Sequence, residues 1–146
     1  MLHLDEVTHI AYTDESKLNV GRYRSIGMIS LSADIIHDCH QELVGLLKES
    51  QISEFKWNKL NDAKMRFAGI KLLDFAISIF KTRKMRTDVL IWDTYDKRHS
   101  ICGRDDKANL ERMYYHLLKH VLSSKWNNDC YWLIRPDEQS VINWES

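Results

Sequence analysis

The chain has 146 residues, of which 44% are apolar and 29% charged, a balance typical of one ordinary globular domain spanning residues 1–146. Lysine plus arginine equals aspartate plus glutamate at 21 each, which excludes a strongly basic nucleic-acid binder and leaves only a local patch for such a partner. The three cysteines form no CxxC pair, no signal peptide is recognisable and no apolar run approaches the roughly 20 residues that cross a bilayer. We therefore expect a cytoplasmic protein without a membrane contact.

The first predicted strand, His9 to Thr13, ends on two adjacent acids, Asp14 and Glu15. Side chains alternate along a strand, so these two carboxylates are expected to point to opposite faces. An acid at the end of a strand is common in metal-assisted sites, and it is equally common where an ordinary turn begins.

A second strand, Arg22 to Ser32, follows a short polar turn at Lys17 to Gly21. Such a short connection predicts that the first two strands form an antiparallel hairpin.

Two helices are predicted next. The first runs from about Ala33 to Lys48, with Ser32 as its N-cap, and the second begins at Asn61 or Asp62. Between them, the segment Glu54 to Trp57 is interpreted as a brief strand or an extended stretch.

The densest basic run in the chain follows the second helix, from Lys81 to Arg86. Cations suit the negative end of a helix dipole, so a solvated helix end is one interpretation. Contact with nucleic-acid phosphates through Lys81, Arg83 and Lys84 is the other.

The rest of the chain alternates strand, helix and strand. Thr87 to Thr94 is a buried-type strand that reaches Asp93 near its end, and Asp105 or Asp106 begins a helix that runs to about Ser124. The apolar stripe of this helix comprises Leu110, Met113, Tyr114, Leu117 and Val121. The last strand, Cys130 to Arg135, is followed by Asp137.

This order of elements predicts an α/β fold in which helix-linked strands run parallel. Three strands then end in acids, Asp14, Asp93 and Asp137, which converge if the strands are neighbours. Crowded carboxylates repel one another unless a cation neutralises them, and Mg²⁺ or Mn²⁺ takes oxygen ligands of this kind. Two such ions assist phosphodiester cleavage in many enzymes. Acids that merely begin turns remain the alternative.

Several short motifs in the same order resemble those of the domain of unknown function 3800 family, which is similar in fold to ribonuclease H. They are Tyr12-x-Asp14-Glu15-Ser16, Phe55-Lys56-Trp57, Asp93-Thr-Tyr-Asp96, Met113-Tyr-Tyr115 and Pro136-Asp137-Glu138-Gln139-Ser140. The resemblance covers most of the chain, and its opening motif is the most specific.

The resemblance implies a ribonuclease H-like mixed sheet with Asp14 on the first strand, Asp93 on the fourth and Asp137 near the end of the fifth. It offers second metal ligands at each strand end, namely Glu15, Asp96 and Glu138. It also implies that Glu54 supplies a further ligand and Lys56 a phosphate contact.

One departure from that family matters, because its members usually continue into a last helix that carries a further Asp. Either the C-terminal helix is truncated in this chain, or another chain completes the site, or the site is not catalytic. An exposed face where that helix should lie would also favour a homo-oligomer. The leading hypothesis is a metal-dependent nuclease. The alternatives are a non-catalytic interaction or nucleic-acid-binding module with an incomplete metal site, and a phosphohydrolase that acts on small molecules.

His116 and His120 stand four residues apart on the last long helix, a spacing that suits a metal. The sequence offers no third ligand near them, so we interpret them as part of an exposed helical face.

Overall fold

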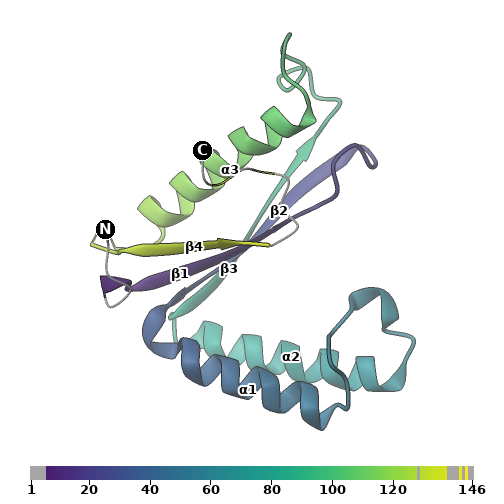
Figure 1. Ribbon diagram of the computed structural model, residues 1–146, viewed down its shortest axis with the longest axis vertical. Helices are drawn as coiled ribbons and strands as arrows, with labels where there is room; N and C mark the ends of the chain where they lie inside the picture. Colours follow the sequence, from purple (N-terminus) through teal and green to yellow (C-terminus); the bar gives the residue numbers. More distant parts are fainter. Residues whose placement is uncertain (1–5, 128, 138–141, 143, 145–146) are drawn as a thin grey trace. The chain divides into compact units, whose positions relative to one another are not determined.

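The protein has a mixed α/β fold. The computed structural model describes residues 6–127, 129–137, 142 and 144, and this part of the chain forms one four-stranded sheet and three α-helices. The elements are β1 (His9–Glu15), β2 (Tyr23–Ser32), α1 (Ile36–Glu49), α2 (Ala63–Lys81), β3 (Met85–Asp93), α3 (Asp106–Ser124) and β4 (Trp132–Pro136) (Figure 1). Within these residues, no helix has the length and apolar character needed to cross a membrane.

The chain folds as two compact units. The first comprises Met1–Ser30 and Thr87–Ser146, and the second comprises Leu31–Arg86. The second unit pairs α1 with α2 around its own small core, which consists of Cys39, Leu46, Ala68 and Phe75. At the start of α2, Asp62 accepts hydrogen bonds from the backbone N–H groups of Lys64 (2.8 Å) and Met65 (3.2 Å) and is the N-cap, in agreement with the prediction that Asn61 or Asp62 begins this helix.

The sheet has the strand order β3-β2-β1-β4. β1 and β4 run parallel, with His9 in register with Trp132 and Thr13 with Pro136. β1 and β2 run antiparallel, because the Ser16 N–H donates to the Ser25 carbonyl (2.9 Å) where β1 ends and β2 begins. This arrangement confirms the predicted hairpin.

β2 and β3 also run antiparallel. The Ser32 N–H donates to the Lys84 carbonyl (2.9 Å) where β2 ends, and the Thr94 N–H donates to the Arg22 carbonyl (2.9 Å) where β3 ends. The prediction that helix-linked strands run parallel is therefore wrong for this pair. The physical reason is that residues 33–84 return to the end of the sheet that they left, as the loop of a hairpin does.

The segment Glu54 to Trp57 forms no strand. Lys56 is extended, but a 3-10 turn begins at Trp57, and the ring of Phe55 packs against Gly69 of α2, where an added Cβ would lie 3.3 Å from it. The Phe55 ring thus packs on α2, and the segment adds no strand to the sheet. Asp93 consequently ends the third strand and Asp137 follows the fourth, not the fourth and fifth as expected.

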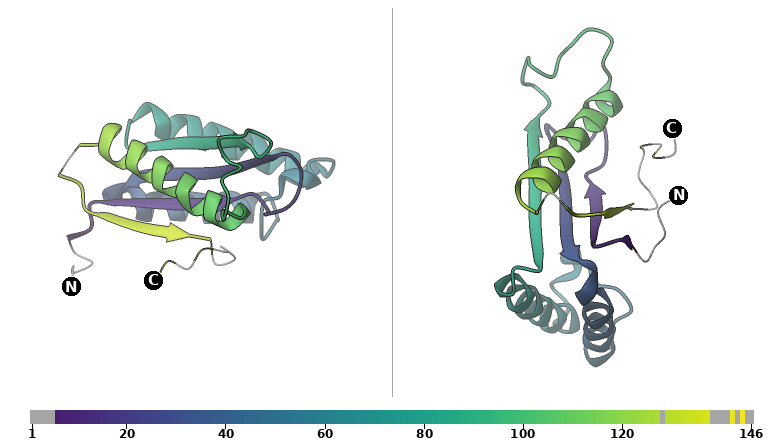
Figure 2. Two further views of the ribbon diagram at one scale, coloured as in Figure 1. Left: turned by 90° about the horizontal axis from the view of Figure 1, so that it is seen from above. Right: turned by 90° about the vertical axis from the view of Figure 1, so that its left-hand side faces the viewer.

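Helix α3 covers one face of the sheet (Figure 2). Its predicted apolar stripe is confirmed in Leu110, Tyr114, Leu117 and Val121, all of which are buried. These side chains pack against Ala11, Ile26, Met28 and Trp92 of the sheet. The opposite face of the sheet is therefore free of α3.

A buried ion pair joins the start of α3 to the β1–β2 turn. The Arg24 side chain is only 5% exposed, and its Nη2 lies 2.8 Å from Oδ2 of Asp106. Its Nη1 donates to the carbonyls of Val20 (2.7 Å) and Gly21 (2.8 Å), and the same Asp106 oxygen accepts from the Asn19 N–H (2.9 Å). The Arg24–Asp106 pair thus binds backbone groups of three successive turn residues, Asn19, Val20 and Gly21.

We predict that Arg24→Met lowers the free energy of unfolding by about 3–5 kcal/mol, because it leaves the partly buried Asp106 without its cation. Urea denaturation checks this. Arg98→Met is the matched control, since the Arg98 side chain is 85% exposed in its own ion pair with Asp96, and its midpoint should stay that of the wild type. Equal midpoints for both variants would contradict the assignment.

Candidate functional site

The parallel pairing of β1 with β4 brings two acids together. The last register pair is Thr13 with Pro136, and the Asp137 N–H continues the ladder by donating to the Thr13 carbonyl (3.0 Å). Asp14 and Asp137 therefore occupy neighbouring positions one residue further on, with backbones about 5 Å apart. Both residues are exposed, and neither forms an ion pair with another described residue.

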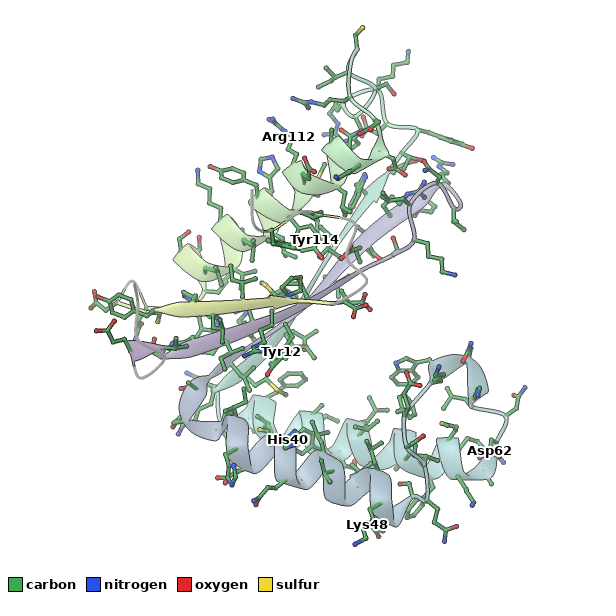
Figure 3. The ribbon with its side chains drawn as sticks, viewed as in Figure 1. Tyr12, His40, Lys48, Asp62, Arg112 and Tyr114 are labelled. Carbon is green, nitrogen blue, oxygen red and sulfur yellow. The ribbon has the colours of Figure 1, made fainter. Side chains whose placement is uncertain are left out.

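Asp14 and Glu15 point to opposite faces of the sheet, as predicted. Tyr12 and Asp14 are exposed on the face away from α3, whereas Thr13 between them is buried. Glu15 lies on the α3 side, where its Oε2 accepts a hydrogen bond from the hydroxyl of Tyr114 (2.5 Å). Figure 3 shows Tyr114 between α3 and the sheet, with Tyr12 on the other side. Glu15 thus anchors the end of β1 and does not join Asp14.

Burial raises the pKa of Tyr114, and the hydrogen bond to the Glu15 carboxylate raises this pKa further. Its side chain is only 2% exposed, so its ring and hydroxyl are fixed by the core. The phenol is therefore a stable neutral donor that fixes the Glu15 carboxylate near the strand end.

Asp93 lies at the same end of the sheet but apart from the other two acids, because β2 separates β3 from β1. Arg22 holds the Asp93 carboxylate with two groups: Nη2 lies 2.5 Å from Oδ2, and Nε donates to Oδ1 at 2.9 Å. The hydrogen bonds from Arg22 lower the pKa of Asp93. The structure thus brings Asp14 and Asp137 together and gives Asp93 its own cation.

Asp96 and Glu138 are two of the predicted second metal ligands, and the described residues do not bring Asp96 to Asp14. Asp96 is bound by Arg98, whose Nη2 lies 2.5 Å away, and this hydrogen bonding lowers the pKa of Asp96 to about 2. Asp96 therefore belongs to a local loop contact and is not paired with Asp14. Glu138 lies outside the described residues.

The cations that were predicted to bind substrate all belong to the second compact unit. Lys84 pairs with Asp34 (2.5 Å), which lowers the pKa of that carboxyl, and Lys56 pairs with Glu54 (2.9 Å). Glu54 is thus engaged in a salt bridge within the segment before α2. Lys81 and Arg83 are exposed around the turn into β3.

Sequence reasoning missed one feature of this sheet end, the environment of Arg22. Its guanidinium carbon lies 5.3 Å from the ring centroid of Tyr23 and 5.3 Å from that of Tyr95. Tyr95 is 72 positions from Tyr23 and 73 from Arg22, so no local pattern pointed to the cluster. The only available signal was that the Asp93-Thr-Tyr95 motif ends a strand.

His116 and His120 line a hollow of about 480 Å³ beside Asp88 of β3. Among the described residues, however, no three His, Cys, Asp or Glu side chains are arranged to hold a metal ion. We therefore keep the interpretation that the two histidines belong to an exposed face of α3.

Comparison with known proteins gives relatives but no family. No protein-family model and no solved structure matches the chain. The chain is 40% identical over 142 residues to the uncharacterized protein ORF2' of Methanothermobacter thermautotrophicus, and 38% identical over 141 residues to the uncharacterized protein ORF2 of the same organism. These alignments cover 92% and 91% of this chain but 49% of each relative, so the chain spans about half the length of the curated relatives it matches.

We predict that Tyr114→Phe lowers the free energy of unfolding at neutral pH by about 1.5–3 kcal/mol, because the Glu15 carboxylate loses its hydrogen-bond donor. The folded-state pKa of Tyr114 lies above the ordinary value of about 10. The contribution of the Tyr114 hydroxyl to the free energy of unfolding is therefore complete below about pH 10, and it is lost as the pH rises through the folded-state pKa. The difference between variant and wild type should shrink in alkaline solution.

Urea titrations at neutral and alkaline pH measure this difference. Tyr115→Phe is the control, because Tyr115 is the next residue of α3 and is 59% exposed. A Tyr114→Phe curve that matches the control at every pH would refute the role of this hydrogen bond.

Proposed function

We propose that the chain is a divalent-metal-dependent nuclease, or a related phosphodiester hydrolase, on a ribonuclease H-like sheet, and that Asp14 and Asp137 hold its metal. The observation that carries this proposal is the parallel pairing of β1 with β4, which sets two exposed carboxylates at neighbouring strand ends. The mixed sheet that begins with a hairpin and the motifs around Asp14 and Asp137 support it further.

The donor chemistry fits a hydrated hard cation. Mg²⁺ retains several waters and is commonly bound through one or two carboxylates together with substrate phosphates, so a pair of acids suffices for it. Among the described residues, no three His, Cys, Asp or Glu side chains are arranged around one point, so the proposal uses two protein ligands. When bound, Mg²⁺ or Mn²⁺ activates water and stabilises negative charge on phosphate oxygens.

The residues of the chain itself have separate tasks in this proposal. Asp14 and Asp137 present carboxylate oxygens on the exposed side of the sheet edge. Glu15 has a structural task on the opposite face of the sheet, where its Oε2 accepts a hydrogen bond from the Tyr114 hydroxyl (2.5 Å). This hydrogen bond fixes the end of β1 against α3. Asp93 is a positioning residue for Arg22 rather than a metal ligand, since the guanidinium occupies its oxygens.

A non-catalytic, nucleic-acid-binding module is the second candidate. It is favoured by the engagement of Asp93 with Arg22 and by the lack of a third ligand among the described residues. The relatives are about twice as long as the chain. Both candidate functions are therefore proposed for the 146-residue chain and not for a protein of the relatives' length. Activity and metal affinity separate the two candidates.

We predict that the 146-residue chain cleaves labelled single- or double-stranded RNA or DNA in the presence of Mn²⁺ or Mg²⁺. Asp14→Asn and Asp137→Asn should each reduce the rate by about a hundredfold or more, because each removes a charged metal ligand. Asp93→Asn should reduce it far less, since it disturbs only the position of Arg22. Gel analysis of cleavage time courses provides the rates.

Asp129→Asn serves as a control, because Asp129 is an exposed acid in the connection between α3 and β4. If the wild type cleaves nothing, or cleaves as fast as Asp14→Asn, the enzymatic proposal fails for this chain. Turnover of nucleotides without cleavage of polymers would indicate a small-molecule phosphohydrolase instead.

We predict that Mn²⁺ binds the wild-type chain and that Asp14→Asn or Asp137→Asn weakens this binding by about tenfold or more, since a divalent ion depends on its charged oxygen ligands. Isothermal titration calorimetry measures the affinity directly. Asp93→Asn should leave it nearly unchanged. An equal loss of Mn²⁺ affinity in Asp93→Asn would contradict the two-acid site and support the three-acid site that the sequence predicted.

A further inference from the structure

The ring pair around Arg22 lies at the same end of the sheet as the acid pair. The turn between β1 and β2 and the loop after β3 meet there, because the Thr94 hydroxyl and N–H both donate to the Arg22 carbonyl (2.7 and 2.9 Å). Both loops belong to the first compact unit, as do Asp14 and Asp137. Tyr23, Arg22 and Tyr95, which we call the Arg22 cluster, therefore lie in the same compact unit as the acids.

The Arg22 cluster also faces the same side of the sheet as Asp14. The hydrogen bonds that join β2 to β3 at its two ends, Ser32 to Lys84 and Thr94 to Arg22, keep one register, which sets Tyr23 opposite Asp93. The Ser16–Ser25 hydrogen bond likewise sets Asp14 opposite Gly27. Residues 23 and 27 of a strand point to the same face, so Tyr23, Asp93 and Asp14 lie on the face away from α3.

The rings of the cluster are available to a ligand. Tyr23 is 58% exposed and Tyr95 is 73% exposed. The guanidinium between them is held in place by Asp93, so the cluster is ordered before any ligand arrives. Exposed, preordered aromatic rings beside an arginine are the usual support for stacked nucleobases.

Further cations lie beside the cluster. Lys17, Lys97 and Arg104 stand in the two loops and would attract the phosphates of a bound strand. Arg22 and Arg98 contribute less net charge, because Asp93 and Asp96 pair with them. The acids of the sheet edge would repel phosphate in the absence of a cation. Asp14 and Asp137 would lose that repulsion if they held a divalent ion.

We propose that the Arg22 cluster is a binding platform for single-stranded nucleic acid, with bases stacked on Tyr23 and Tyr95 and the strand directed toward Asp14 and Asp137. This inference rests on the proposed function, because it supplies the substrate class for the same sheet edge. Single strands are favoured over duplexes, since only unpaired bases expose their faces to aromatic side chains.

Binding without cleavage tests the platform separately from the nuclease. Fluorescence anisotropy is measured with labelled single-stranded RNA, single-stranded DNA and a DNA duplex, in EDTA and in Ca²⁺. We expect the wild type to bind single strands more tightly than the duplex. Tyr23→Ala with Tyr95→Ala should weaken that binding by about tenfold or more, because stacking on each ring contributes substantially per base.

The conservative pair, Tyr23→Phe with Tyr95→Phe, should retain the affinity of the wild type, since the ring faces remain. Tyr115→Ala is the matched control: Tyr115 is 59% exposed and also carries a cation over its ring, with Lys119 Nζ 5.6 Å from the centroid, but it lies on α3. Circular dichroism confirms that each variant is folded. Preference for RNA over DNA among the single strands identifies the natural polymer.

The variant with Asp14→Asn and Asp137→Asn separates the two proposals. It should bind single strands in EDTA at least as tightly as the wild type, because it has lost two repelling charges, while losing all cleavage. If no protein cleaves but the tyrosine variant still binds more weakly, the nuclease proposal fails and the platform stands. The platform is overturned if the wild type binds no single strand in either buffer, if it prefers the duplex, or if Tyr115→Ala weakens binding as much as the tyrosine pair.

Discussion

The register between β1 and β4 is the constraint on which the candidate site depends. Side chains alternate along a strand, so a slip of one residue would turn Asp137 toward α3 and away from Asp14. The core prevents this slip, because Trp132 packs against the cluster that contains Ala11, and Thr13 is paired with Pro136 on the same side. Apolar packing on one face of the sheet thus determines which acids meet on the other.

The acids at this end of the sheet differ in their chemistry because their neighbours differ. Asp93 lies beside Arg22 and receives a bidentate contact that lowers its pKa, so this acid is neutralised within the fold. Asp14 and Asp137 form no ion pair with the described residues, which is why the proposed cation site is assigned to them. An acidic strand end is therefore weak evidence for a metal until the neighbouring cation is known.

Local patterns in the sequence predicted the elements better than their arrangement. Alternation and helical spacing located β1, β2, α2 and α3, and Asp62 was correctly expected near the start of α2, because these features depend on residues a few positions apart. The pairing of Arg22 with Asp93 joins residues 71 positions apart, and no periodicity encodes such a contact. The same limit explains why Asp93 was grouped with Asp14: the insertion of β2 between their strands is a property of the whole sheet.

The long connection between β2 and β3 explains how one chain combines a hairpin-like pairing with a second compact unit. Closing a longer loop costs only about 0.6 kcal/mol for each doubling of its length, so the antiparallel pair tolerates residues 33–84 between its arms. That segment compensates by burying its own core around Phe75 and Ala68. Because the acid pair and the Arg22 cluster both lie in the first unit, their geometry depends on the register of the sheet and on α3. The basic turn around Lys84 belongs to the other unit, and Lys84 is paired there with Asp34.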